Sequence, residues 1–153
     1  MTYTMTAASN LDPGSSLFFR LTVDGRDMGL FNGCEGLAMR VEVETYSEGG
    51  NNGYATQLPS RLTYPSLRLT RPLTPDSADL TAWITSIVTG IERPTIEIAA
   101  LRADGTMVTQ WSLLEALPAG WTGPTLDPSS SEVATETLEI VYHGFLSTGA
   151  SGS

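Results

Sequence analysis

The chain has 153 residues, with 17 acidic and 8 basic side chains, 41% apolar residues, one cysteine and one histidine. This length fits one domain that can bury a core without a disulfide or a metal ion. A formal net charge of −9 argues against nucleic-acid binding, because phosphate contacts depend on Lys and Arg. The sequence has no apolar run of the ~20 residues that a membrane-spanning helix needs. The 15 Gly and 9 Pro residues favour strands and turns over long helices.

Both ends of the chain are small, polar and rich in turn-forming residues. We expect a flexible extension over residues 1–15, a folded domain over 16–146 and a flexible tail over 147–153. The first residues lack the basic start and apolar run of a secretory signal, so we expect synthesis as a soluble cytoplasmic protein.

The first half of the domain alternates apolar and polar side chains, which predicts strands. One strand is expected over 17–23, ending in a turn at Asp24-Gly25. A second strand is expected over 39–46, with a polar side that must meet water. Residues 47–61 are rich in Gly and Asn and predict a long loop, after which 62–70 returns to strand.

One helix is predicted after the turn signals of residues 73–77. Apolar side chains recur there at the spacing of one helix face. This helix core stripe consists of Leu80, Trp83, Ile84, Ile87 and Val88. Asp76 or Ser77 can cap the first amides, and Gly90 suits the end.

The second half predicts a hairpin, a loop and a last strand. Strands over 95–102 and 106–114 flank an Asp-Gly pair, which is a strong hairpin signal. Three prolines and two glycines predict a loop over 117–131, and alternation resumes over 133–142. The residues therefore predict a mainly β fold of about six strands and one helix.

No residue or motif in the sequence is a convincing candidate for a catalytic, metal or phosphate site. His143 has no Cys, second His or nearby Asp in sequence, and Cys34 is an improbable nucleophile. Glu42 and Glu44 share a strand side, but a solvated sheet face explains them better than a metal or acid/base pair. The glycines of residues 49–53 lack the lysine and helix of a phosphate site. We expect no catalytic, metal or cofactor site, and no enzyme activity.

The order of several phrases resembles a known family. These are FNGCEGL at 31–37, the strand and glycine-rich loop of 38–53, LTAWITSI at 80–87, WSLLEALP at 111–118, and SEVA at 131–134 leading into a last strand. Together they resemble the inner tube proteins of contractile injection systems and the related tail tube proteins of contractile-tailed phages. The resemblance covers residues 17 to 143.

The resemblance implies an α+β fold that is mainly β, an antiparallel sandwich or partial barrel with one flanking helix, in a tube-forming structural subunit. Six copies would join their sheets into a multi-subunit β-barrel ring, and rings would stack into a tube that carries or delivers cargo. The polar strand sides implied to face the lumen are Arg40, Glu42, Glu44, Arg68, Thr70, Thr137 and Glu139. The loop implied to contact a neighbouring subunit includes Ser47, Gly49, Gly50, Asn51, Asn52, Gly53 and Tyr54.

The implied partners are other copies of the chain, a sheath protein, the baseplate, tube-terminating proteins and possible protein cargo, with no nucleic-acid specificity. The assembled particle could be released and act outside the cell. Two alternatives stay open: a paralogue that starts the tube at the baseplate, as the resemblance also allows, and a β-sandwich module that binds a ligand.

Overall fold

The computed structural model describes residues 17–46, 56–90, 93–125, 127–129 and 133–149. The first sheet has the spatial order β11 (Phe145–Gly149), β8 (Met107–Leu113), β7 (Ile96–Leu101), β1 (Phe18–Val23) and β2 (Arg26–Phe31). The second sheet has the order β3 (Gly33–Glu35), β6 (Leu67–Pro72), β10 (Thr135–Val141) and β9 (Leu117–Thr122). A separate hairpin pairs β4 (Arg40–Tyr46) with β5 (Thr56–Thr63), and the one helix described is α2 (Ser77–Thr89).

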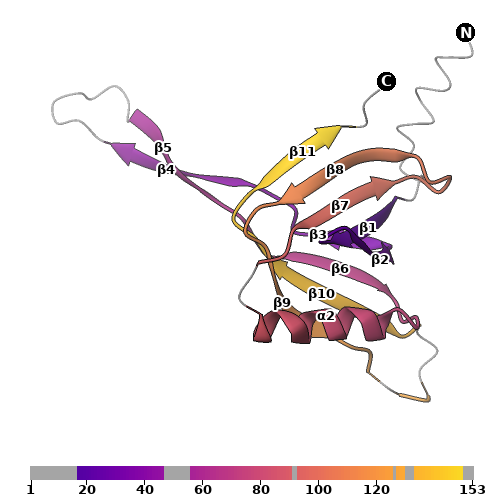
Figure 1. Cartoon of the computed structure of the whole chain (residues 1–153). Coiled ribbons are helices and arrows are strands. Elements are labelled where there is room, and N and C mark those ends of the chain that lie inside the picture. Colours follow the sequence, from indigo (N-terminus) through magenta and orange to yellow (C-terminus); the bar gives the residue numbers. More distant parts are fainter. Residues whose placement is uncertain (1–16, 47–55, 91–92, 126, 130–132, 150–153) are drawn as a thin grey trace, which may run out of the picture.

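The two larger sheets form an open sandwich with antiparallel pairing throughout (Figure 1). They meet at a corner where β2 leads into β3, and the Asn32 amide donates to the Thr70 carbonyl at 3.1 Å. Their inward side chains form one core cluster that also includes Leu80 and Trp83 of α2. The predicted mainly β sandwich with one flanking helix is confirmed, and the sheets do not close on themselves within the described chain.

Strand alternation explains which side chains enter this core. Leu21 and Val23 of β1 and Leu67 and Leu69 of β6 are buried, while the residues between them are more exposed. The predicted turn after β1 is also confirmed, because Asp24 and Gly25 both adopt positive φ, at 49° and 81°. Two positive φ values are what a tight hairpin turn requires.

The helix buries a narrower stripe than the sequence predicts. Leu80 and Trp83 are buried, and Ile84 and Ile87 pack partly buried against the core. Val88, by contrast, is 83% exposed, so its place in the stripe was wrong. Eight residues turn a helix about 80° beyond two full turns, which carries Val88 past the edge of the contact.

The β4–β5 hairpin, here called the arm, projects away from the sandwich (Figure 1). Its second strand corrects two predictions, since residues 56–61 of the expected loop belong to β5. The expected single strand over 62–70 is divided at residues 64–66, where the chain passes from the arm to β6. Pairing with β4 supplies hydrogen bonds that composition alone does not reveal.

Two further boundaries differ from the prediction. Residues 117–122 form β9 instead of loop, because an edge strand accepts a proline such as Pro118 without losing an inner ladder bond. At the carboxyl end, β11 continues to Gly149 through pairing with β8, so the flexible tail does not begin at 147. The expected extension over 1–15, the loop residues 47–54 and the last residues 150–153 lie outside the described chain.

A buried ion pair lies in the core beneath the helix. The Arg71 Nε donates to Glu136 at 2.6 Å, and both side chains are almost fully buried. Arg71 also donates to the Met28 carbonyl at 2.9 Å, and its guanidinium lies over the Phe31 ring. The Trp121 indole donates to the other Glu136 oxygen at 3.3 Å. One charged network thereby connects β2, β6, β10 and β9.

Removing one partner of this pair should destabilise the domain strongly. We expect Arg71→Met to lower the free energy of unfolding by ~3–5 kcal/mol, because Glu136 would keep an uncompensated buried charge. The double variant Arg71→Met/Glu136→Gln should lose less, since no buried charge remains. Urea denaturation followed by circular dichroism measures both.

The matched control is Arg68→Met, three positions earlier on the opposite side of β6. It should stay within ~0.5 kcal/mol of the wild type, as exposed positions usually do. An Arg71→Met variant as stable as the Arg68→Met variant would contradict a structural role for the pair.

Candidate assembly interface

The outer face of the second sheet is polar. Strand pairing places Glu35, Arg68 and Glu139 in one cross-strand row, and Thr70 and Thr137 in the next. The two threonine hydroxyls lie 3.3 Å apart. Because side chains alternate along each strand, this polar face is the necessary reverse of the side that carries Leu69 and Leu138 into the core.

The helix lies on the other side of this sheet. Trp121 is the cross-strand partner of Leu138, so it belongs to the inward side of β9. Helix residues Ala78 and Thr81 line a shallow groove together with Trp121. The polar face and the helix therefore mark opposite sides of the second sheet, and the polar face stays uncovered by any other described element.

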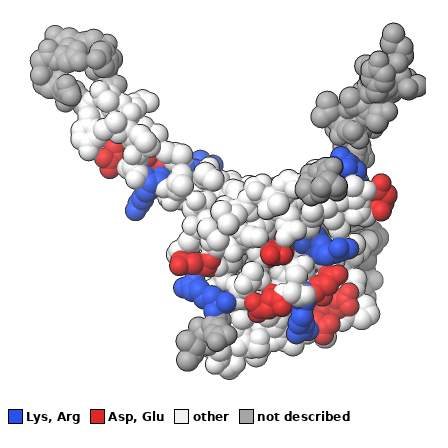
Figure 2. All heavy atoms as spheres, turned by 45° about the horizontal axis from the view of Figure 1, so that its top comes forward, with Lys and Arg blue, Asp and Glu red and all other residues white. Residues whose placement is uncertain are grey.

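Charges of opposite sign alternate across the polar face. Arg68 has an acidic neighbour on each side, Glu35 on β3 and Glu139 on β10. Opposite charges directly across strands stabilise the pairing modestly. A polar face of this kind is well hydrated. On the side of the molecule drawn in Figure 2, acidic and basic side chains likewise lie next to one another on the body.

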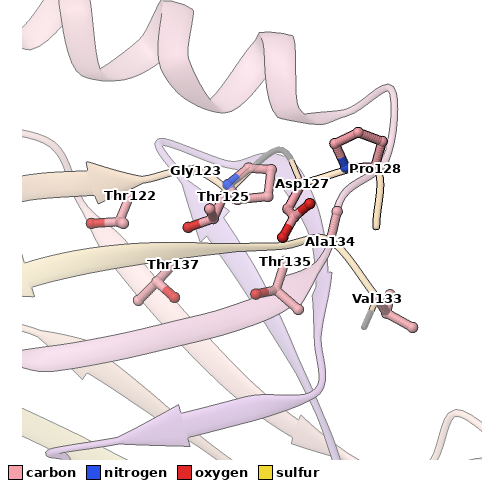
Figure 3. Close-up of a pocket in the computed structure, with 10 residues that line it drawn as sticks. Thr122, Gly123, Thr125, Asp127, Pro128, Val133, Ala134, Thr135 and Thr137 are labelled. Atoms are coloured by element: carbon pink, nitrogen blue, oxygen red, sulfur yellow. The ribbon is translucent and has the colours of Figure 1, made fainter. Parts of the chain in front are cut away.

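A hollow lies at one end of the polar face (Figure 3). Hydroxyl groups of Thr122, Thr135 and Thr137 line it, and Asp127 is its one charged lining residue among those described. The Asp127 carboxylate accepts from the Ser129 amide and hydroxyl at 3.0 and 2.7 Å, which lowers its pKa. These hydrogen bonds to Ser129 close a local turn. Because they stabilise the charged carboxylate, they make Asp127 a poor general acid or base.

The arm exposes an apolar side. Val41, Val43 and Leu62 are 50%, 54% and 48% exposed. Val41 lies directly across from Leu62, and Val43 across from Pro59. No other described strand pairs with the arm or covers this side. Apolar side chains grouped on a projecting hairpin are typical of a surface that a partner buries.

The other side of the arm is mainly polar, although Leu58, which is 48% exposed, lies there across from Glu44. Arg61 forms an ion pair with Glu42, and this hydrogen bond raises the pKa of the Arg61 guanidinium. The Tyr46 hydroxyl donates to Glu44 at 3.1 Å. The arm therefore has one mainly polar side and one mainly apolar side, like a strand pair taken from a larger sheet.

The seven predicted lumen residues fall into two groups. Arg68, Thr70, Thr137 and Glu139 share the polar face of the second sheet. Arg40, Glu42 and Glu44 share the polar side of the arm. The structure thus brings members of each group together, while the orientation of either group toward a lumen stays a prediction.

The described residues contain no constellation for catalysis. His143 lies 3.5 Å from Glu115, but both side chains are about two-thirds exposed. Burial raises the pKa of the Cys34 thiol to about 11, so the thiol is neutral at physiological pH and a poor nucleophile. No group of three or more His, Cys, Asp or Glu side chains in the described chain could hold a metal ion. The structure also shows no helix, among the residues it describes, that is long and apolar enough to cross a membrane.

Sequence reasoning missed three features. The pattern of alternate residues in β6 and β10 could have placed Arg71 and Glu136 inward, because Arg71 comes two positions after buried Leu69 and Glu136 two positions before buried Leu138. The exposure of the apolar side of the arm had no sequence signal. Neither did the contacts of Tyr142, whose hydroxyl reaches residues more than a hundred positions away.

Comparisons with known proteins agree with this geometry. The fold matches a chain of an extracellular contractile injection system, the PVC sheath-tube complex in its extended state, with a TM-score of 0.78, 21% identity and coverage of 98% of this chain and 99% of that one. It matches a chain of the anti-feeding prophage (AFP) baseplate with a TM-score of 0.70, 26% identity and coverage of 89% and 94%.

A more distant match is Hcp1 from Flavobacterium johnsoniae, with a TM-score of 0.51, 17% identity and coverage of 87% of this chain and 96% of that one. Among curated proteins, none matches the chain significantly. The model of the T4-like virus tail tube protein gp19 family matches residues 15–146, which is nearly the whole domain. The chain therefore belongs to the family of the T4-like virus tail tube protein gp19.

Proposed function

We propose that this protein is the structural subunit of the inner tube of a contractile injection system. Copies of the chain form rings, and the rings stack into a tube whose lumen carries or delivers protein cargo. Family membership and the likeness to chains of contractile injection systems support this function. The role is mechanical, and it uses surfaces in place of a catalytic centre.

The apolar side of the arm is the observation that carries the proposal. A two-stranded hairpin cannot bury its own apolar side, and isolated hairpins are marginally stable in water. Val41, Val43 and Leu62 together would gain a few kcal/mol if a neighbouring copy covered them, because full burial of such a side chain contributes ~1.5–3 kcal/mol. Assembly thus completes a core that one copy leaves open.

Open sheet edges supply the remaining contacts of a ring. Within the described chain, β11 and β9 each end a sheet with one side unpaired. Such edges present free amide and carbonyl groups that readily pair with another chain. We propose that neighbouring copies pair along edges of this kind, which joins their sheets around a common axis.

The polar face of the second sheet would then line the lumen. It lies opposite α2, so a ring with the helix outward turns Arg68, Thr70, Thr137 and Glu139 inward. The polar side of the arm would extend the same surface with Arg40, Glu42 and Glu44. A hydrated wall of mixed charge would let polypeptide cargo pass without binding it tightly.

The outer side of the tube would meet the other components. The PVC neighbour belongs to a complex of sheath and tube, and other neighbours come from a baseplate and a tube-terminating cap. By analogy, a sheath would surround this tube, a baseplate would start it and a terminator would end it. Assembly would take place in the cytoplasm, with later release of the particle.

Placing a charge on the apolar side of the arm should prevent assembly. We expect Val43→Asp and Leu62→Asp to abolish tubes in negative-stain electron microscopy, because each would place a carboxylate in the completed contact. The separate chains should remain folded, since both positions are half exposed in one copy. Circular dichroism checks the fold.

Val88→Asp is the matched control, because it makes the same substitution at an exposed valine on the helix. Its tubes should match those of the wild type. Long filaments of wild-type protein indicate a tube-body subunit, whereas single rings indicate a subunit that starts the tube. Filament formation by Val43→Asp at wild-type concentrations would refute the role of the arm.

Cysteine labelling tests the lumen assignment. A cysteine in place of Arg68 should react with a bulky polyethylene-glycol maleimide in the unassembled chain but not in tubes, because the reagent cannot enter the lumen. A cysteine in place of Thr85, exposed on the helix, should react in both states.

Wild-type protein serves as the blank in this experiment, because it reports any labelling of Cys34, whose raised pKa should slow the reaction of its thiol. Gel shifts report the extent of labelling. Equal protection of both introduced cysteines would mean that the helix also becomes buried. Protection of position 85 alone would show that the polar face points outward.

A further inference from the structure

The two chain segments that join the arm to the sandwich converge on one side chain. Residues 36–39 connect β3 to β4, and residues 64–66 connect β5 to β6. Tyr142 lies directly after β10, is only 3% exposed and contacts both connections. The base of the arm is therefore built around a buried tyrosine that belongs to the rigid sandwich.

Among the residues that the structure describes, the Tyr142 hydroxyl forms hydrogen bonds only with the first connection. It accepts a hydrogen bond from the Ala38 amide at 3.2 Å. The hydroxyl oxygen lies 2.9 Å from the Gly36 carbonyl oxygen and 3.2 Å from the Ala38 carbonyl oxygen, so the hydroxyl can donate its proton to either. Burial raises the pKa of the Tyr142 phenol, so the hydroxyl keeps its proton and its donor role at neutral pH. Both carbonyls belong to the segment that enters β4.

The Tyr142 ring holds the second connection. Tyr64, the residue after β5, packs against the Tyr142 ring at 5.5 Å between centroids and against the Phe145 ring at 6.0 Å. Aromatic pairs at such distances add stabilisation beyond their buried area. One side chain thus fixes both ends of the arm, by hydrogen bonds on one connection and by ring packing on the other.

The segment that carries Tyr142 is itself held to the sandwich by backbone hydrogen bonds. Next to Tyr142, the His143 amide donates to the Leu114 carbonyl at 2.9 Å, and the Leu114 amide donates to the Gly144 carbonyl at 2.7 Å. These bonds fasten the segment between β10 and β11 to the end of β8. Tyr142 therefore cannot follow a swinging arm without breaking contacts of the sandwich.

The two connections also touch each other through their backbones. Gly36 has a φ of +88°, and a Cβ at this position would lie 2.0 Å from the Ser66 carbonyl oxygen. Only glycine permits this approach. Because the two backbones touch here, one connection cannot bend without displacing the other.

We propose that Tyr142 is a positioning residue, whose hydroxyl fixes the direction in which the arm leaves the sandwich and thereby prepares the chain for assembly. The assembly part of this inference rests on the proposed function of the arm. An arm that already points in its assembled direction loses little conformational freedom on binding a neighbour. A merely structural tyrosine would support the core through its ring, and its hydroxyl would not affect the arm.

The test compares Tyr142→Phe with Tyr64→Phe. The first variant removes the hydroxyl and keeps the ring. The second makes the same chemical change in the same aromatic cluster, at a hydroxyl that has no hydrogen bond to the described residues. Spin labels on cysteines introduced at the exposed positions Thr45, on the arm, and Ala103, on the sandwich, report the distribution of arm directions in the unassembled full-length chain.

We expect a broader distance distribution for Tyr142→Phe and an unchanged one for Tyr64→Phe. The concentration needed for tube formation should rise about tenfold for Tyr142→Phe, as the loss of a typical pair of hydrogen bonds would produce. It should not change for Tyr64→Phe. A Tyr142→Phe distribution as narrow as that of the wild type would overturn the inference, whatever its effect on assembly.

Gly36→Ala is the second variant, in case Tyr142→Phe fails to fold by circular dichroism. It keeps the Tyr142 hydroxyl but separates the connections, so it should also broaden the distribution; a narrow one would count against a fixed base. The label measurement is independent of tubes. If wild-type protein forms none while Tyr142→Phe still broadens the distribution, the proposed function fails and the positioning role stands.

Discussion

A two-stranded hairpin cannot cover its own apolar side, and much of this structure follows from that constraint. Each strand of the sandwich turns its dry side toward a second sheet or toward the helix. The arm continues the same alternation beyond the reach of either sheet, so Val41, Val43 and Leu62 meet solvent in a single copy. The energy that would stabilise the arm is thus available only between molecules, which couples its stability to assembly.

The sandwich supplies what such an arm needs, which is a rigid base. The Arg71–Glu136 pair connects strands of both sheets beneath the helix, and it does so in a core that otherwise has apolar contacts. At the other end of the domain, Tyr142 is held between β10 and β11 and contacts both segments that lead to the arm. Hydrogen bonds to buried polar groups are directional, so they specify one geometry more sharply than apolar packing does, even though the buried Arg71 Nη2 has no hydrogen-bond partner among the described residues.

The polar face of the second sheet and the apolar side of the arm have complementary physical characters. The face is hydrated, with charges of both signs, and is suited to lie beside water and passing polypeptide. The arm is suited to exclude water. In the proposed tube the two surfaces would serve a common purpose, because a tube needs a hydrated inner wall and apolar contacts between its subunits.

The sequence by itself determined the strands with clear alternation, the turn at Asp24-Gly25, the helix and the family, because these depend on local periodicity and on phrases in a fixed order. Strands β5 and β9 escaped prediction, because Pro59 in β5 and Pro118 and Gly120 in β9 favour a loop unless the strand is paired with a partner, as each is in the structure. The tertiary structure alone decided that the arm leaves the core with its apolar side exposed and that Tyr142 holds its base. Alternation shows which side chains share a face, but only the packing of distant segments decides what covers that face.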